Sequence, residues 1–271
     1  MKKNITNIVI CYANEDEVVT YARQLAIQTI SNKIHLTIVI NKEAKGEQYL
    51  QEKMSEIGIR YSIYNPGRNL GYLNGLLFGY SKMTTNSEWY VLSNTDIEIF
   101  DNQFFETFAN GFYLNDKDIW LVGPSVYAQL RKLYTNPYLL NRPTKTKYIV
   151  KNIGMTFPSI YDFLFRIKSK IRAKQDVTVQ PPSGMIYAIH GSFMFLHMNL
   201  MEELIKRAPW ELLYDEEQYI AEVVRANNKK VFYDSSIQVI HNEGACTGKA
   251  NIRNRYSCMR RSNKRLIREF Y

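Results

Sequence analysis

The sequence predicts an α/β fold whose nucleotide-binding half comes first. Apolar, β-branched runs alternate with helical patterns at the start of the chain, in the order strand, helix, strand, helix, strand. A further apolar run then ends in the polar and acidic residues 93–98. Open α/β sheets bind ligands at the carboxyl ends of their strands, so we expect a site there.

Composition agrees with one large domain, or one domain with an appendage. The chain has 271 residues, 45% of them hydrophobic, with 20 Tyr and 13 Phe, which is enough for a full core. The chain has three cysteines, Cys11, Cys246 and Cys258, with no CxxC spacing. This odd number and spacing disfavour a disulfide framework or a zinc site, so we expect a reducing, cytoplasmic compartment. No run approaches the ~20 apolar residues of a membrane span, and the N-terminal apolar run is too short for a signal peptide.

The net charge of +9 is concentrated in two segments. Residues 131–174 carry 11 Lys/Arg against the single acid Asp162, and residues 249–271 carry eight against Glu269. The remainder has 16 basic and 24 acidic residues, a net charge of −8. The two basic segments therefore either meet an anionic surface or are simply solvated.

The first half supplies the elements that the fold class needs. Asn14, with Glu17 three residues later, forms a capping pattern before the first helix. The hydrophobic periodicity predicts strands at 5–10, 34–40 and 59–64 and helices at 18–30 and 46–57.

A loop rich in glycine and asparagine, residues 65–75, follows the third strand and precedes a predicted helix at 76–82. Such a loop lets backbone amides approach an anion at the helix N-terminus, although a tight turn without a ligand is an open alternative. The loop is neither a phosphate-loop sequence nor a dinucleotide fingerprint.

Asp96 follows the predicted buried strand at 89–92. A carboxylate at that place can hold a hard divalent cation against phosphate oxygens. Strands also end in Asn-Thr-Asp simply to begin a turn, so both interpretations stay open from these residues alone.

The second half predicts further alternation around an irregular insertion. Residues 125–182 lose the pattern and become basic and aromatic, and within them 160–174 reads as a basic amphipathic helix of the kind that lies on anionic membranes. A surface helix with its apolar face on the core is the alternative. We also expect helices at 101–110, 200–207 and 215–226, strands at 119–123, 185–190, 192–196, 230–233 and 237–240, a loop at 241–248, and a basic C-terminal helix.

Three polar clusters end separate apolar runs: Asn94 with Asp96, Glu216 with Glu217, and His241. Asp96, His241 and diphosphate oxygens would suit Mg²⁺ or Mn²⁺. Alternatively, His241 forms a hydrogen bond with the backbone. The acidic residues 215–217 would then simply begin a helix, where their negative charge complements the helix dipole. His190 and His197 are interpreted as structural.

Five motifs in order resemble the family 2 glycosyltransferases of the GT-A fold, especially the branch that builds bacterial capsule, O-antigen and rhamnose-containing polysaccharides. The motifs are Asn65-Pro66-Gly67-Arg68-Asn69-Leu70-Gly71, Asn94-Thr95-Asp96, Gly191-Ser192-Phe193-Met194, Glu216-Glu217, and His241 followed by Gly244-Ala245-Cys246-Thr247-Gly248. The chain departs from the family pattern in having Asn94 where the stricter motif has Asp, and Glu-Glu where many relatives have Glu-Asp. Residues 125–182 match no motif.

The resemblance implies a Rossmann-like mixed sheet flanked by helices. It implies a GT-A domain at 1–248, with a nucleotide-binding half at 1–100 and an acceptor half at 101–248 that contains the insertion 125–182. A basic helical appendage at 249–271 completes the chain.

The resemblance also implies inverting transfer from a nucleotide-diphosphate sugar, UDP- or dTDP-linked, to a saccharide or polyprenyl-linked acceptor. Glu217, or alternatively Glu216, would be the base, and Asp96 and His241 would hold Mn²⁺ or Mg²⁺. Gly191 and Ser192 would lie on the acceptor side. The donor would be held by Tyr12, Ala13, Asn14, Asn41, Asn69, Gly71, Asn94 and Thr95.

Two other functions compete with this one. A non-catalytic protein that binds sugar nucleotides or membranes on the same fold is the main alternative to an enzyme acting peripherally at the inner face of a bacterial membrane. Nucleic-acid binding is disfavoured, because the basic residues avoid the motif-bearing segments and no binding module appears.

Overall fold

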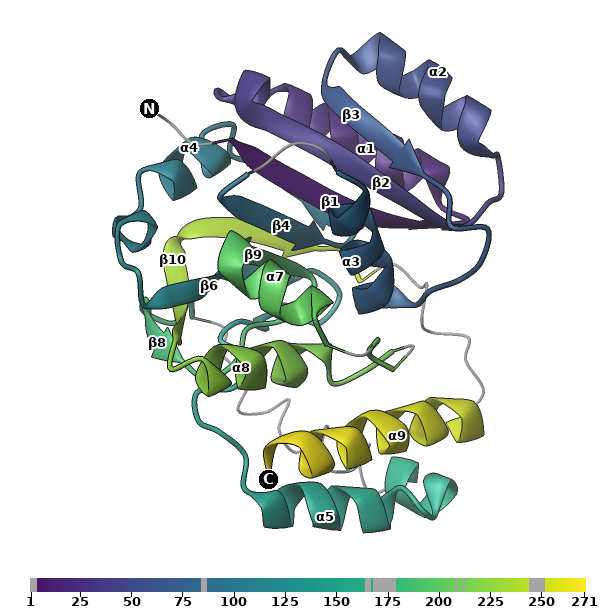
Figure 1. Ribbon diagram of the computed structural model, residues 1–271, viewed down its shortest axis with the longest axis vertical. Coiled ribbons are helices and arrows are strands. Elements are labelled where there is room, and N and C mark those ends of the chain that lie inside the picture. The colour runs from purple at the N-terminus through teal and green to yellow at the C-terminus, as the bar shows by residue number, and fades with distance from the viewer. Residues whose placement is uncertain are drawn as a thin grey trace.

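The fold is built on a mixed β-sheet of ten strands with helices on both faces (Figure 1). The computed structural model describes residues 4–83, 87–163, 167, 179–207, 209–211, 213–243 and 252–271. Its strands are β1 (Ile5–Tyr12), β2 (Ile34–Lys42), β3 (Arg60–Tyr64), β4 (Trp89–Ser93), β5 (Ile97–Glu98), β6 (Ile119–Ala128), β7 (Leu133–Tyr134), β8 (Gly184–Ile186), β9 (Phe193–His197) and β10 (Lys230–His241). The helices are α1 (Glu15–Ala26), α2 (Glu47–Ile57), α3 (Tyr72–Lys82), α4 (Phe104–Ala109), α5 (Lys145–Gly154), α7 (Met198–Ile205), α8 (Glu216–Ala226) and α9 (Ile252–Phe270), with 3-10 turns at Ser31–Lys33 and Phe112–Leu114.

The sheet order brings distant segments to one edge. The strands lie in the order β3-β2-β1-β4-β9-β6-β10-β5, and the first four are parallel. β9 runs antiparallel to both β4 and β6, so its first residue, Phe193, lies opposite Ser93 at the end of β4. The segment before β9 therefore meets the segment after β4.

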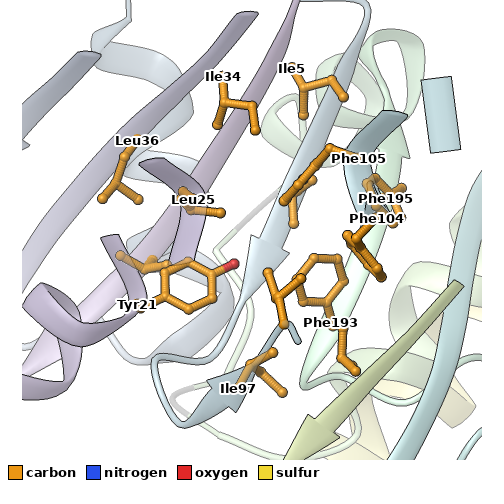
Figure 2. Close-up of a cluster of buried hydrophobic side chains, with 14 of the residues drawn as sticks. Ile5, Tyr21, Leu25, Ile34, Leu36, Ile97, Phe104, Phe105, Phe193 and Phe195 are labelled. Carbon is orange, nitrogen blue, oxygen red and sulfur yellow. The ribbon is translucent and has the colours of Figure 1, made fainter. Parts of the chain in front are cut away.

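Residues of β4 alternate between two cores, one on each face of the sheet. Trp89 and Val91 join the core under α1, α2 and α4, whereas Tyr90 and Leu92 join the core under α3, α7 and α8. A strand buried on both faces needs a continuous apolar run, which is the pattern that predicted it. Figure 2 shows part of the first core, where Phe104, Phe105, Phe193 and Phe195 meet beside the sheet.

Several predicted boundaries are corrected by the structure. The expected helix at 18–30 runs instead from Glu15 to Ala26, and α3 begins at Tyr72, so Asn74 and Gly75 belong to the helix and not to the loop. Gly75 packs on the sheet at a distance where an added Cβ would lie 2.7 Å from Ile10 Cδ1. A larger residue at this turn of α3 would require the side chain of Ile10 to move.

The two strands expected at 230–233 and 237–240 are one strand, β10, with a bulge at which the pairing with β6 skips from Asp234 to Gln238. Asp234 Oδ1 accepts hydrogen bonds from the backbone N–H and the hydroxyl of Ser236, which stabilise the extra residues. The strand expected at 185–190 is shorter, ending at Ile186.

Two helices lie side by side at one end of the molecule, α5 and α9 (Figure 1). α5 lies inside the region that the sequence showed only as irregular and basic. The predicted helix at 160–174 falls mostly outside the described residues, as does 244–248. Among the described residues, no helix has the length and apolar character needed to cross a bilayer.

Candidate active site

Segments from three parts of the chain meet at the carboxyl edge of β4. The backbone N–H of Asn94 donates to Ser192 O at 2.9 Å, and that of Asn242 donates to Asp96 O at 3.0 Å. His241 pairs with Ile97 across β10 and β5. The topology therefore gathers three of the motifs found in the sequence.

Repeated Asx turns shape the loop before α3. Asn65 Oδ1 accepts from the N–H of Gly67 at 2.8 Å, and Asn69 Oδ1 accepts from that of Gly71 at 2.9 Å. Gly67 and Gly71 have φ angles of +71° and +81°, which glycine adopts without strain. The spacing of asparagine and glycine in this motif is thus explained by two consecutive turns.

Asn41 forms hydrogen bonds with the same loop. Its Nδ2 donates to Gly71 O at 2.8 Å, its Oδ1 accepts from Leu70 N–H at 3.3 Å, and the residue is 7% exposed. In this structure both ends of its amide position the turn.

Three of the residues expected to hold the donor, Tyr12, Ala13 and Asn14, lie at the end of β1 and directly after it. Tyr12 is 40% exposed, and Ala13 has a φ of +57°. Asn14 precedes α1 as expected, but its side chain caps no helix N–H: it donates to Glu17 Oε2 at 2.8 Å and to Thr95 Oγ1 at 2.7 Å. The loops after β1 and β4 are therefore joined directly.

Asp96 and His241 face each other. Asp96 Oδ2 lies 3.3 Å from His241 Nε2, and their side chains are only 13% and 12% exposed. Asn94 Nδ2 lies 3.5 Å from the same nitrogen.

This pair fits a divalent ion. Carboxylate oxygen and imidazole nitrogen are both ligands of divalent ions, and atoms 3.3 Å apart could bind the same ion. Within the described part of the chain, no group of three or more His, Cys, Asp or Glu side chains is placed to hold a metal. The protein would thus supply two ligands, and diphosphate oxygens or water would complete the shell.

His190, interpreted from the sequence as structural, lies beside this pair. Its ring centroid is 5.7 Å from that of His241, and its Nδ1 accepts from the N–H of Ser192 at 3.2 Å. Burial, aided by His241 and Arg131, lowers the pKa of His190 to about 3, so the ring is neutral.

The acidic pair begins α8. Glu216 is 7% exposed and Glu217 is half-buried. Tyr214 N–H donates to Glu216 Oε1 at 2.8 Å, and Gly191 N–H donates to Glu217 Oε1 at 3.3 Å. Burial raises the pKa of both carboxyls, and the charge of Glu217 raises that of Glu216 further. Such a carboxylate accepts a proton more readily than an exposed one.

Gly191 lies against the carboxylate of Glu217. An added Cβ at this position would lie 2.8 Å from Glu217 Oε1. The Gly191-Ser192 segment therefore contacts the acidic pair on one side and Asn94 on the other.

Tyr72 is a site residue that sequence reasoning missed. Its hydroxyl donates to Gly191 O at 2.9 Å. Burial raises its pKa well above the usual value, and the charges of Glu216, Glu217 and Asp96 raise it further. Tyr72 adjoins the recognised Gly71, but its partner lies 119 residues away, so the sequence carried no signal for the contact.

A cavity of about 370 Å³ opens beside the acidic pair. Its walls come from α5, α9 and the start of α8, and they are rich in tyrosine and basic side chains. The lining includes Tyr138, Lys147, Tyr148, Lys151, Tyr161, Tyr214, Asp215, Glu216, Glu217, Arg255 and Tyr256. A buried carboxylate next to such a space can take a proton from a bound hydroxyl group.

Similar folds occur among solved structures. The mannosyltransferase PcManGT from Pyrobaculum calidifontis, in complex with GDP-Man and Mn²⁺, matches with a TM-score of 0.57 and 12% identity over 91% of this chain. S. aureus TarS 1–349 in complex with UDP-GlcNAc matches with a TM-score of 0.58 and 12% identity over 92% of this chain. GalNAc-T7 with UDP, GalNAc and Mn²⁺ matches with a TM-score of 0.58 and 9% identity over 93% of this chain.

The fold is that of the GT-A glycosyltransferases. The predicted fold class is therefore confirmed, whereas the family 2 branch and the domain limits stay predictions. The chain spans 59% of the PcManGT chain, 61% of the TarS chain and 47% of the GalNAc-T7 chain. No protein-family model and no curated protein matches the sequence.

Proposed function

We propose that this protein is an inverting glycosyltransferase that moves a sugar from a nucleotide-diphosphate sugar to an acceptor hydroxyl. The carrying observation is the contact of Gly191 with both Glu217 and, through Ser192, Asn94, which joins an acidic pair to the Asp96–His241 pair on a GT-A sheet. The complexes of PcManGT with GDP-Man and of TarS with UDP-GlcNAc support a donor of this class. A UDP- or dTDP-linked sugar is our specific proposal.

Glu217 acts as the general base. It accepts the proton of the acceptor hydroxyl, whose oxygen forms a bond to C1 of the sugar while the bond from C1 to the diphosphate oxygen breaks. Attack from the face opposite the diphosphate inverts C1, and no covalent enzyme intermediate is needed. Glu216 is the alternative base, but its carboxylate already accepts the N–H of Tyr214.

Asp96 and His241 would hold Mn²⁺ or Mg²⁺, which when bound neutralises charge on the leaving diphosphate. The Mn²⁺ complexes of PcManGT and GalNAc-T7 support this assignment. Tyr12, Ala13, Asn14, Asn41, Asn69, Gly71, Asn94 and Thr95 would line the donor side, as the motif resemblance implies.

The acceptor is proposed to be a surface saccharide or a polyprenyl-linked saccharide, bound in the cavity beside Glu217. The tyrosines of the cavity offer flat faces and hydroxyl groups to a sugar. Gly191 contacts Glu217 at the cavity, and Ser192 contacts Asn94, which is proposed to lie on the donor side. Membership of family 2 and action at the cytoplasmic face of a bacterial membrane belong to the same proposal.

Release of nucleoside diphosphate from a panel of nucleotide sugars tests the function. The wild type should release one nucleoside diphosphate, faster with acceptor saccharides, and Glu217→Gln should lower the rate by about 10²–10⁴-fold. A folded wild type that binds a nucleotide sugar but never turns it over would instead support the non-catalytic alternative. Wild-type rates in both Glu217→Gln and Glu216→Gln would contradict the base assignment.

A further inference from the structure

A row of large apolar side chains lies exposed along α5 and the segment that follows it. We call this the α5 row. Its members are 61–64% exposed, although each is of a type that folding usually buries. They are Val150, Ile153, Phe157, Ile160 and Phe163.

The spacing of the row is helical: successive members are three, four, three and three residues apart. α5 ends at Gly154, and after a turn the chain is helical again at 158–163. The spacing of three or four residues between exposed apolar side chains is kept across this turn. Two successive helical stretches and the turn between them therefore expose five large apolar side chains within 14 residues.

The opposite face of this segment is already anchored. Tyr148 and Asn152 of α5 are 2% and 8% exposed. Tyr161 packs so closely on Gly154 that an added Cβ there would lie 2.5 Å from its ring, and its ring meets that of Tyr256 on α9. The α5 row is thus the face left over after the segment has packed on α9.

The segment that carries the row has more basic than acidic residues. Between residues 131 and 163 the chain has six Lys/Arg (131, 132, 142, 145, 147 and 151) and one acid, Asp162. Asp162 is 8% exposed, and its carboxylate accepts a hydrogen bond from Tyr256, so it offers no negative charge to the surface. Three of the six basic side chains, those of Arg131, Arg142 and Lys151, are paired with acids. Lys145 and Lys147 are exposed on α5 itself, and Nζ of Lys145 also donates to Tyr271 O.

We propose that the α5 row docks on an anionic phospholipid bilayer, with its apolar side chains entering the interface and the neighbouring lysines meeting lipid phosphates. α5 lies at one end of the molecule, beside α9 (Figure 1). α5 also supplies Lys147, Tyr148 and Lys151 to the cavity beside Glu217. If the proposed function holds, docking brings this cavity to the membrane surface, where a lipid-linked acceptor would be found.

Co-sedimentation with vesicles tests docking without reference to activity. Full-length protein is mixed with phosphatidylcholine vesicles, with or without phosphatidylglycerol, at low salt. We expect binding to vesicles that contain phosphatidylglycerol, and at least about a tenfold weaker affinity for the Ile153→Asp/Phe157→Asp variant. The matched control is Ile27→Asp/Phe100→Asp, which alters one Ile and one Phe that are 67% and 58% exposed elsewhere. The control should bind as the wild type does.

Three sedimentation results would overturn the proposal: no sedimentation of the wild type, equal loss of binding in both double variants, or full binding by the α5 variant.

Light scattering of the free protein tests whether a second copy covers the row. A dimer that Ile153→Asp/Phe157→Asp abolishes would also overturn the proposal. Nucleoside diphosphate release with a water-soluble acceptor should be unchanged in that variant. Vesicle binding without any transfer would instead overturn the proposed function alone.

Discussion

At the scale of single residues, the contact between Gly191 and Glu217 is the most exacting in the site. Because an added Cβ would lie 2.8 Å from Oε1 and 3.2 Å from Cγ of Glu217, Gly191→Ala must displace the proposed base. We expect kcat to fall by about 10–100-fold while the donor KM changes little. Gly184→Ala is the control, since nothing lies within 4 Å of its added Cβ. An unchanged kcat in Gly191→Ala would argue against Glu217 as the base.

Burial of Glu216 has a consequence for stability. Its pKa is raised in the folded protein, so between the ordinary value of 4.5 and the raised one the folded state holds a proton that the unfolded state lacks. The contribution of Glu216 to stability is therefore full below pH 4.5 and is lost as the pH rises through the folded pKa.

Glu216→Gln should accordingly stabilise the fold at pH 8 and should have little effect at pH 4.5. The glutamine Oε1 can still accept the N–H of Tyr214. Urea denaturation of both proteins at the two pH values measures the difference. If Glu216→Gln is less stable than the wild type at pH 8, the folded protein stabilises the ionised carboxylate of Glu216, and the prediction is wrong.

The sequence predicted individual residues unevenly. Asn69 and Gly71 were predicted as a turn beside a ligand, and the structure explains the turn, although ligand binding is still a prediction. The contact of Tyr72 with Gly191, and that of His190 with His241, join residues far apart in the chain, so no local pattern could predict them.

At the scale of elements, Glu222 of α8 ties the C-terminal helix to the body of the protein. It is fully buried and accepts from Arg142, Arg225 and Tyr187 at 2.6, 2.8 and 2.8 Å, and from Tyr271 at 3.2 Å. Burial raises its pKa, but these hydrogen bonds outweigh burial and lower it.

Glu222→Gln should therefore cost about 3 kcal/mol of unfolding free energy, because it leaves two guanidinium groups with a weaker partner. Glu56→Gln, in an exposed pair with Lys53, should cost less than about 1 kcal/mol. Thermal and urea denaturation compare the two variants. Equal, small losses would mean that the Glu222 cluster contributes no more than an exposed ion pair.

The same cluster explains why the basic segments were hard to interpret. The sequence allowed a surface for anions or simple solvation, but Arg142 instead pairs with Glu222, and Arg265 of α9 lies 4.9 Å from the ring of Trp210. Lys151 likewise pairs with Asp215. These partners lie 80, 55 and 64 residues away, beyond what charge counting along the chain can detect.

At the scale of the whole molecule, the alternation of strands and helices predicted the order of the elements from β1 to β3 correctly. The antiparallel insertion of β9 between β4 and β6 has no local signature, because its apolar pattern fits either direction. That insertion carries Ser192 to Asn94, so this contact depends on a topological feature that the sequence pattern did not predict.

Binding of nucleoside diphosphates tests the central claim most directly. UDP, dTDP and GDP are titrated with Mn²⁺ while the unfolding temperature of the wild type and of Asp96→Ala is followed. One of them should stabilise the wild type by about 2.7 kcal/mol at a hundred times its Kd, only with metal present, and Asp96→Ala should lose this shift while remaining folded. An equal, metal-independent shift in both proteins, or no shift with any nucleotide, would contradict the account.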